Sequence, residues 1–318
     1  MWSYVLRRVL FAVPIALGVS MLCFGLIFLA PGNPMQLLLP ADATAEAIEI
    51  IKKAYGFDKP IPLQYLAWLQ KAVTGDLGLS IANRRPVLEE VLNALSNTVV
   101  LSLAAVTIAF SLAFVLGTIA AYFRGGVIDR GVTAMSVMGV SVPNYWLGMV
   151  LIIIFSVELG WLPATGMGAQ GSTDFSLFNW ENMKHAILPI FTLCMIPLGI
   201  IMRTTRSAVA EVLNLDFVQT LRAKGLGELA VVRHAVRNAL PQVLAVMGLQ
   251  FGYLMGGSIL VETIFTWPGT GFLLHKAILT RDLPVLQGTI LVLSLIFVAV
   301  NLIVDLAQTW VDPRIKRA

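Results

Sequence analysis

Long uncharged apolar runs alternate with short polar segments along most of this chain. Six of these runs are long enough, or nearly so, to cross a bilayer, which takes about 20 residues of helix. The runs are Val9–Ala30, Thr98–Phe123, Gly131–Val157, Ala186–Met202, Asn238–Val261 and Leu283–Val304. The pattern therefore predicts an all-α integral membrane protein with six transmembrane helices.

Two of the six runs contain residues that interrupt helices. Ala186–Met202 is the shortest run and holds Pro189 and Pro197. Prolines are tolerated in membrane helices where neighbouring helices satisfy the freed carbonyl groups, so a kinked helix buried in the bundle is expected. Gly139 and Pro143 predict a similar break in the third run.

Composition supports the membrane class and excludes several chemistries. The chain is 58% hydrophobic and 13% charged, against about 25% charged in soluble domains. Cys23 and Cys194 lie in apolar runs and are expected to be small core residues. The three histidines are scattered, with neither a zinc-protease motif nor a phosphate-binding loop, so neither a membrane-embedded enzyme nor an ATPase is indicated.

The distribution of lysine and arginine predicts the orientation. With the N-terminus inside, most of the 22 basic residues fall in cytoplasmic segments. The main exception is the long outer region, and long translocated regions largely escape the positive-inside rule. Both termini are therefore expected to be cytoplasmic. The predicted organisation is an N-terminal tail and first transmembrane helix (1–30), a periplasmic region of short helices (31–97), a five-helix transmembrane core (98–310) that includes a short cytoplasmic helix near 213–228, and a cytoplasmic tail (311–318).

The outer region is predicted to form three short helices. The first is capped by Thr44 and ends at Gly56, the second covers Gln64–Val73 and stops before Gly75, and the third starts at Pro86. We expect them to lie on the outer surface and shape a mouth. For the third, a plain membrane-interface helix without a binding role is an equal alternative.

Charges are placed at the ends of the runs. A charge in mid-membrane would cost about 2.5–3.5 kcal/mol and usually marks an ion or proton site. Its absence argues against an ion-coupled secondary transporter, although backbone carbonyls can also bind sodium. Arg203, Glu262 and Asp305 are interpreted as interface anchors.

The polar stretch from Asp216 to Pro241 is the most informative segment. Asp216 with Gln219 fits a capping box, and Gly225 is a suitable stop after a helix of about eight residues. Arg222 and Lys224 complement the negative helix end. A helix this short is not stable alone in water, so it must pack on lipid headgroups or on a partner protein.

An apolar stripe and the mixed polarity of this helix bear on that choice. Leu213, Phe217 and Leu221 recur at a spacing of four, which predicts one apolar face. A lipid-binding helix is typically rich in lysine and arginine, whereas this one mixes acidic, amide, hydroxyl and basic side chains. The residues favour docking into a protein cleft, with the lipid surface as the alternative.

One further feature belongs to the fifth run, Asn238–Val261. Gly248, Gly252 and Gly256 repeat every four residues, a small-residue ridge that allows close helix approach. The ridge can meet another helix of this chain or a partner subunit, and internal packing is slightly favoured.

Several segments together resemble one transporter family. The segment Gln219–Gly225 (QTLRAKG) resembles the cytoplasmic signature of binding-protein-dependent ABC importer permeases, and more narrowly of the dipeptide/oligopeptide (peptide/nickel/glutathione) permease family. Four more stretches and the C-terminal end match in order and are spread along nearly the whole chain: Leu29–Pro34, Gly75–Ser80, Ser156–Pro163, Glu262–Gly271 and Asp312–Ile315.

The resemblance implies a type I ABC importer permease architecture and a role for the short helix. In that family it is the coupling helix, which inserts into a groove on a cytosolic ATPase. The residues carried over are Asp216, Phe217, Gln219, Thr220, Leu221, Arg222, Ala223, Lys224, Gly225 and Glu228. By analogy with the fold, Trp267, Pro268 and Gly271, between the last two spans, are expected to line an outer gate.

The chain also departs from the family pattern. Leu221 stands where a small alanine is expected, and the segment from Gly225 to Pro241 is about two residues shorter than the family arrangement. These departures leave the expected docking of the helix on an ATPase intact in outline, but the alignment of the residues after Gly225 with the family pattern is left undecided.

The resemblance further implies the partners and the location. These are a second related permease, two ATPases that bind ATP and Mg²⁺, a periplasmic or lipid-anchored binding protein, and membrane lipid. No nucleic acid, and no cofactor, metal or catalytic residue in this chain, is expected. The implied function is import of small peptides across a bacterial inner membrane. Glutathione or nickel chelates are the alternative substrates, and an ion-coupled secondary transporter is a less favoured alternative.

Overall fold

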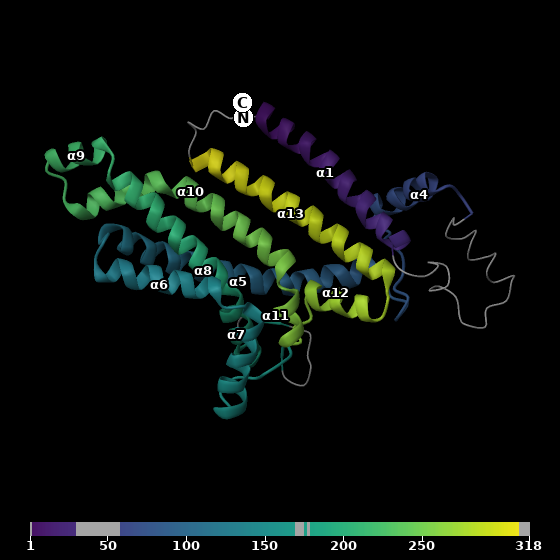
Figure 1. Cartoon of the computed structure of the whole chain (residues 1–318). Helices are drawn as coiled ribbons and strands as arrows, with labels where there is room; N and C mark the ends of the chain where they lie inside the picture. Colours follow the sequence, from purple (N-terminus) through teal and green to yellow (C-terminus); the bar gives the residue numbers. More distant parts are fainter. Residues whose placement is uncertain (1, 30–57, 169–174, 177–178, 312–318) are drawn as a thin grey trace. The chain divides into compact units, whose positions relative to one another are not determined.

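The computed structural model (Figure 1) describes residues 2–29, 58–168, 175–176 and 179–311. Within this part every named element is a helix, and the one β-bridge is an isolated pair, Leu79 with Pro86. The all-α class predicted from the sequence is confirmed.

The chain divides into two compact units. The first comprises 1–96 and 269–298, and its helices are α1 (Trp2–Leu29), α4 (Ile61–Val73), the start of α5 (Val87–Tyr122), α12 (Thr270–Leu279) and most of α13 (Leu283–Val311). The second comprises 97–268 and 299–318. Its elements are the rest of α5, α6 (Val127–Ser141), α7 (Asn144–Leu151), the π-helix η1 (Ile152–Glu158), α8 (Trp180–Leu213), α9 (Asp216–Ala223), α10 (Glu228–Gly257), α11 (Ile259–Ile264) and the end of α13.

Several helices have the length and composition to span a membrane. Among the described residues these are α5, α8, α10 and α13, and α6 with α7 and η1 forms a fifth, bent candidate. Helix α1 is 28 residues long. The chain is therefore rich in membrane-spanning helices, while the count of six spans and the cytoplasmic termini stay predictions.

The third run is broken where Pro143 predicted. The axis bends by 96° between α6 and the helical pair that follows. Val142 caps α6 in an extended conformation (φ −84°, ψ 123°), and Pro143 precedes the first residue of α7. A residue before proline is pushed out of the helical region by the proline ring, so the chain turns here.

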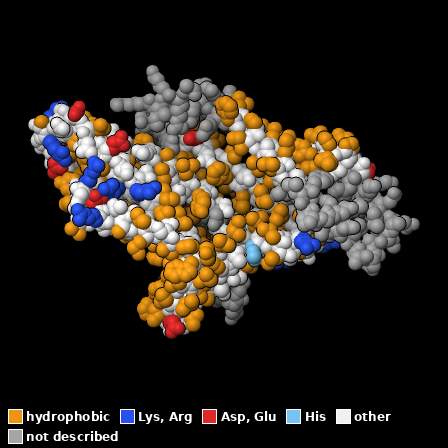
Figure 2. Space-filling model, viewed as in Figure 1, with side chains coloured by type: hydrophobic (Ala, Val, Ile, Leu, Met, Phe, Trp, Pro, Cys, Tyr) orange, Lys and Arg blue, Asp and Glu red, His pale blue; other side chains and the backbone are white. Residues whose placement is uncertain are grey.

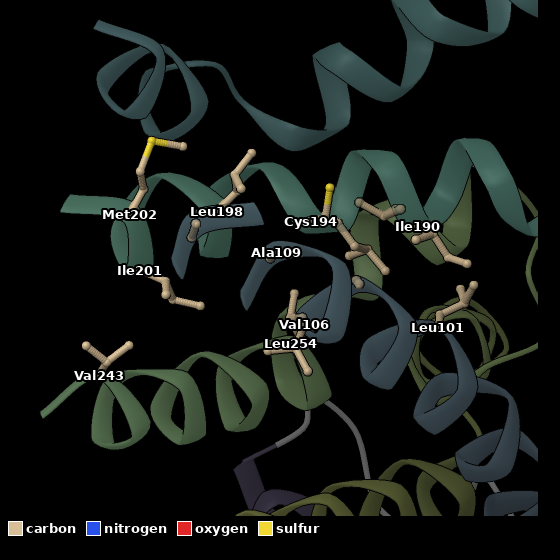
Figure 3. Packing of buried hydrophobic residues seen from close by; sticks show 14 of the residues in the cluster. Leu101, Val106, Ala109, Ile190, Cys194, Leu198, Ile201, Met202, Val243 and Leu254 are labelled. Carbon is tan, nitrogen blue, oxygen red and sulfur yellow. The ribbon is translucent and has the colours of Figure 1, made fainter. Parts of the chain in front are cut away.

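Helix α8 is the buried centre of the second unit, as its prolines suggested. In its most apolar window 67% is buried, against 33% for α5 and for α10. Cys194, Leu198 and Ile201 of α8 belong to one buried hydrophobic cluster with Val106 of α5 and Leu254 of α10 (Figure 3). Pro189 and Pro197 are themselves buried inside this one continuous helix.

Glycines let two helices approach α8 at backbone distance. A Cβ added at Gly199 would lie 2.4 Å from the carbonyl oxygen of Ser136 on α6. One at Gly139 of α6 would lie 2.9 Å from a carbonyl oxygen of α8, and one at Gly117 of α5 would lie 2.7 Å from the carbonyl oxygen of Met202. Such contacts are a main source of helix association in lipid. Gly139 was expected to help break the third run, and this is wrong, because it lies inside α6 at one of these contacts.

The glycines of the predicted ridge on α10 lie in different surroundings. Gly248 packs inside the chain, since an added Cβ would lie 2.1 Å from a methyl group of Val304 on α13. Gly252 is buried, whereas Gly256 is exposed and has nothing within 4 Å of an added Cβ. Internal packing is thus confirmed at Gly248, whereas Gly256 packs against no other helix of the described residues.

The outer region follows the prediction in part. Helix α4 ends at Val73, and Gly75 has the positive φ (+87°) expected after a helix stop. The expected helix at Thr44 lies outside the described residues. The prediction of a separate third short helix is wrong, because α5 begins at Val87 and runs unbroken to Tyr122. No proline or glycine lies between its first turns and the apolar run, so nothing ends the helix at the predicted boundary after Asn97.

The loop that carries the Gly75–Ser80 motif is held by one buried carboxylate of the first unit. Asp282 is 3% exposed and caps α13 through the backbone N–H of Val285. Its Oδ2 also accepts from the Ser80 hydroxyl and from the backbone N–H of Ala82 at 3.1 Å. The motif is therefore explained by a rigid turn anchored on the start of the last helix.

Candidate functional site

Helix α9 is the predicted short polar helix, and it has the predicted length of eight residues. Figure 1 shows it at one end of the second unit, where α8 leads into it and α10 leaves it. The side-chain amide of Asn214, at the end of α8, donates to the Ala210 carbonyl at 2.8 Å. A tight turn at residues 214–215 then changes the chain direction before α9 begins.

The expected capping box is wrong. Leu215 is the N-cap residue (φ −78°, ψ 148°), and no side chain caps the helix. Asp216 lies one position later, as the first helical residue, and its carbonyl accepts from the Thr220 hydroxyl at 3.2 Å. A carboxylate in the first turn still interacts favourably with the positive end of the helix dipole.

The expected apolar stripe is also corrected. Leu213 ends α8 and so does not continue the face of α9. Val218 is the buried residue of α9, with 0% exposure, whereas Phe217 is 38% exposed and Leu221 is half-buried. The turn between the two helices rotates the pattern, so Val218 holds α9 in place and Phe217 is accessible.

The stop at Gly225 is confirmed in detail. Its φ is +80°. The N–H of Gly225 donates to the carbonyl of Arg222 at 2.9 Å, and the N–H of Leu226 donates to the carbonyl of Leu221 at 3.2 Å. This pair of bonds is the Schellman arrangement, which requires a left-handed residue after the helix.

An ion pair closes the turn between α9 and α10. Arg222 donates from Nε to Oε1 of Glu228 at 2.9 Å and from Nη2 to Oε2 at 3.1 Å. Hydrogen bonding from Arg222 lowers the pKa of the Glu228 carboxyl, so the pair persists at neutral pH and is lost as the pH falls through that lowered value. The spacing of six residues is no helix repeat, so sequence reasoning missed the pairing.

The surface around α9 is mixed in character. Figure 2 shows lysine, arginine, aspartate and glutamate side chains gathered on this end, while hydrophobic side chains cover much of the remaining visible described surface. Three large apolar side chains are exposed beside these charges: Leu215, Phe217 and Leu229. The exposed members of the predicted set are Asp216, Phe217, Gln219, Thr220, Arg222, Ala223, Lys224, Gly225 and Glu228. Aromatic and arginine side chains within a polar rim are typical of protein-docking surfaces.

The expected gate residues lie in different surroundings. Trp267 is fully buried, donates from its indole N–H to the Asn97 carbonyl at 3.1 Å and packs edge-on against Phe175. The Asn97 side-chain amide donates in turn to the Pro268 carbonyl at 2.9 Å. Gly271 is buried near the start of α12, in the other unit. The Trp267 ring therefore faces the protein interior in this conformation, and the gate role stays a prediction.

Glu262 is no interface anchor. Its side chain is fully buried, and Oε1 accepts hydrogen bonds from the hydroxyls of Thr98 and Ser258, both at 2.8 Å. The fifth apolar run is interrupted at Ser258, between α10 and α11. This break turns Glu262 inward. Arg203 is exposed on α8 and Asp305 is half-buried on α13.

We expect Glu262→Ala to lower the free energy of unfolding by about 2–4 kcal/mol, because the change opens a cavity and removes the acceptor of two buried hydroxyls. Thermal unfolding in detergent measures the effect. Glu262→Gln is the matched control, since it keeps an oxygen acceptor and should lose much less. An Ala variant as stable as the parent would contradict the structural role.

Known proteins resemble the chain along its length. The family model for the binding-protein-dependent transport system inner membrane component matches residues 113–317, and the model for its N-terminal part matches residues 1–104. The dipeptide transport system permease protein DppB of Alkalihalophilus pseudofirmus is 40% identical over 332 residues, covering 99% of this chain and 100% of the relative. The glutathione transport system permease protein GsiC of Escherichia coli is 39% identical over 317 residues, covering 99% of each.

Proposed function

The chain belongs to the family of binding-protein-dependent transport system inner membrane components, and from this premise we propose that it is the permease subunit of an ATP-driven importer for small peptides. It is a multi-pass protein of the inner membrane, because the family is an inner membrane component and several of its helices are long and apolar enough to span.

Small peptides are the substrate class that the relatives favour. One relative is named for dipeptides and another for glutathione, which is itself a tripeptide. Dipeptides or oligopeptides are therefore the first candidates and glutathione the next. Nickel chelates rest on the sequence resemblance alone. An ion-coupled secondary transporter is the least favoured alternative, because the family is a component of binding-protein-dependent transport systems.

The observation that carries the coupling part of the proposal is the accessible surface of α9. Val218 holds the helix on the chain and leaves Phe217 exposed beside Arg222 and Lys224. A partner ATPase that docks on this surface would bind ATP and Mg²⁺. Its closure would then be transmitted through α9 to the helices joined to it, α8 and α10. The proposed assembly has two such ATPases, a second related permease and a periplasmic or lipid-anchored binding protein.

A mild-detergent pull-down of the tagged chain tests the proposal. We expect a second permease and ATPase subunits to co-purify in near-equal amounts, and reconstituted vesicles to take up labelled dipeptides when ATP and the binding protein are supplied. Competition with unlabelled dipeptide, glutathione and nickel chelate then ranks the substrates. A chain that purifies alone would contradict the assembly and favour a lipid-surface role for α9.

A further inference from the structure

An ion pair between the buried Asp129 and the partly exposed Arg206 joins α6 to α8 close to the end that carries α9. Asp129 of α6 is 4% exposed, and its carboxylate faces the guanidinium of Arg206 on α8. Arg206 donates from Nε to Oδ1 and from Nη2 to Oδ2, the second bond measuring 2.7 Å. A bidentate arginine–carboxylate pair fixes orientation as well as distance.

The same carboxylate also fixes the turn between α5 and α6. Asp129 Oδ2 accepts from the backbone N–H of Gly125 at 2.8 Å, and Gly125 has a φ of +84°. One side chain therefore ties the start of α6 and the preceding turn to α8. A lone bond between two helices would fix much less.

Arg206 lies close enough to α9 along the chain for a displacement of α9 to reach it. It lies seven positions before Leu213, the last residue of α8, which is about 10 Å along a helix. Helix α9 begins three residues after Leu213. The ion pair thus lies about two turns from the point where a partner bound to α9 would move α8.

Backbone contacts continue this attachment along α8. Gly199 and Gly139 hold α6 and α8 at backbone distance, and Gly117 holds α5 on the Met202 turn of α8, one turn before Arg206. Close-packed helices of this kind respond to force together, because interiors are dense and do not deform continuously.

We propose that Asp129 and Arg206 are positioning residues for coupling, which make α6 and the α5–α6 turn move with α8 as one body when α9 is displaced. This rests on the proposed function of α9. Net stabilisation is a poor explanation for the pair, since the Arg206 side chain is 27% exposed and ion pairs in contact with solvent contribute little to stability. A fixed relative position of the two helices is what a bidentate pair adds.

The test places spin labels at Val127 on α6 and Ser207 on α8, both exposed. The buried Cys23 and Cys194 are first replaced by alanine. In the assembled complex we expect the same narrow label-to-label distance in the nucleotide-free and ATP-bound states. In Asp129→Asn we expect the distance to broaden or to differ between the states, and peptide uptake to fall about tenfold, with ATPase attachment and hydrolysis retained.

Two variants complete the design. Glu181→Gln breaks an exposed ion pair with Lys184 at the other end of α8 and should leave distances and uptake unchanged. The exchange Asp129→Arg with Arg206→Asp should restore part of the uptake. A parental distance that changes between the two states, or normal uptake by Asp129→Asn, overturns the proposal.

The label-to-label distance in the parent protein tests the proposal even if Asp129→Asn fails to fold. Failure of the proposed function is recognised separately, because Phe217→Ala would then still co-purify with the ATPases.

Discussion

Replacing Phe217 by alanine is expected to reduce peptide uptake to background while leaving the protein inserted and folded. Phe217 is 38% exposed on α9, and the neighbouring Val218 supplies the buried contact. Truncation therefore removes little from the chain's own packing, but it removes the aromatic side chain that a docking partner would bury. Loss of an aromatic anchor costs about 2–4 kcal/mol at many interfaces, enough to separate a complex of moderate affinity.

Uptake in vesicles, together with co-purification of the ATPases, measures this effect. Gly225→Val is expected to act in the same direction, because a branched residue is strained at a φ of +80°, although an added Cβ there would touch nothing. Glu181→Gln, an exposed change at the other end of α8 and outside the docking set, is the control and should transport normally. Undiminished uptake in both the Phe217 and Gly225 variants would remove the coupling role from α9.

Gly199→Leu is expected to have the largest effect on folding. An added Cβ at Gly199 already lies 2.4 Å from the Ser136 carbonyl oxygen and 2.8 Å from a Val140 methyl group. The first of these is backbone and cannot rotate away, so α6 and α8 must separate. We expect a loss of at least about 3 kcal/mol in the free energy of unfolding, measured as a lower unfolding temperature and a lower yield of monodisperse protein in detergent.

Gly131 provides the matched control on α6. Nothing lies within 4 Å of an added Cβ at this position, so Gly131→Ala should be neutral or stabilise the helix by up to about 1 kcal/mol. Equal behaviour of the Gly199 and Gly131 variants would mean that the α6–α8 contact is looser than the structure indicates.

Local features of the structure were predictable because neighbours in sequence decide them. Pro143 restricts the residue before it, and the helix breaks there. Gly225 alone adopts the left-handed turn easily, and α9 ends there. The burial of α8 followed from a short apolar run with two prolines, which lipid-facing helices accommodate poorly. The error at Asp216 was a shift of one residue, within the usual uncertainty of helix boundaries.

The candidate site was predictable for the same reason. Its residues are contiguous, so recognising the segment already brought them together. Which side chain of α9 would be buried was less predictable, because this depends on the turn at Asn214 and Leu215 that sets the rotation of α9 against α8.

By itself, the sequence determined the helical membrane class, the breaks at proline and glycine, and the identity and length of the polar helix, since each depends on residues within a few positions of one another. Only the tertiary structure decided which polar groups meet. Arg206 finds Asp129 across 77 positions, and Thr98 finds Glu262 across 164. A charge in a helix has the same local pattern whether it faces lipid, water or an opposite charge, and the packing of other helices decides among the three.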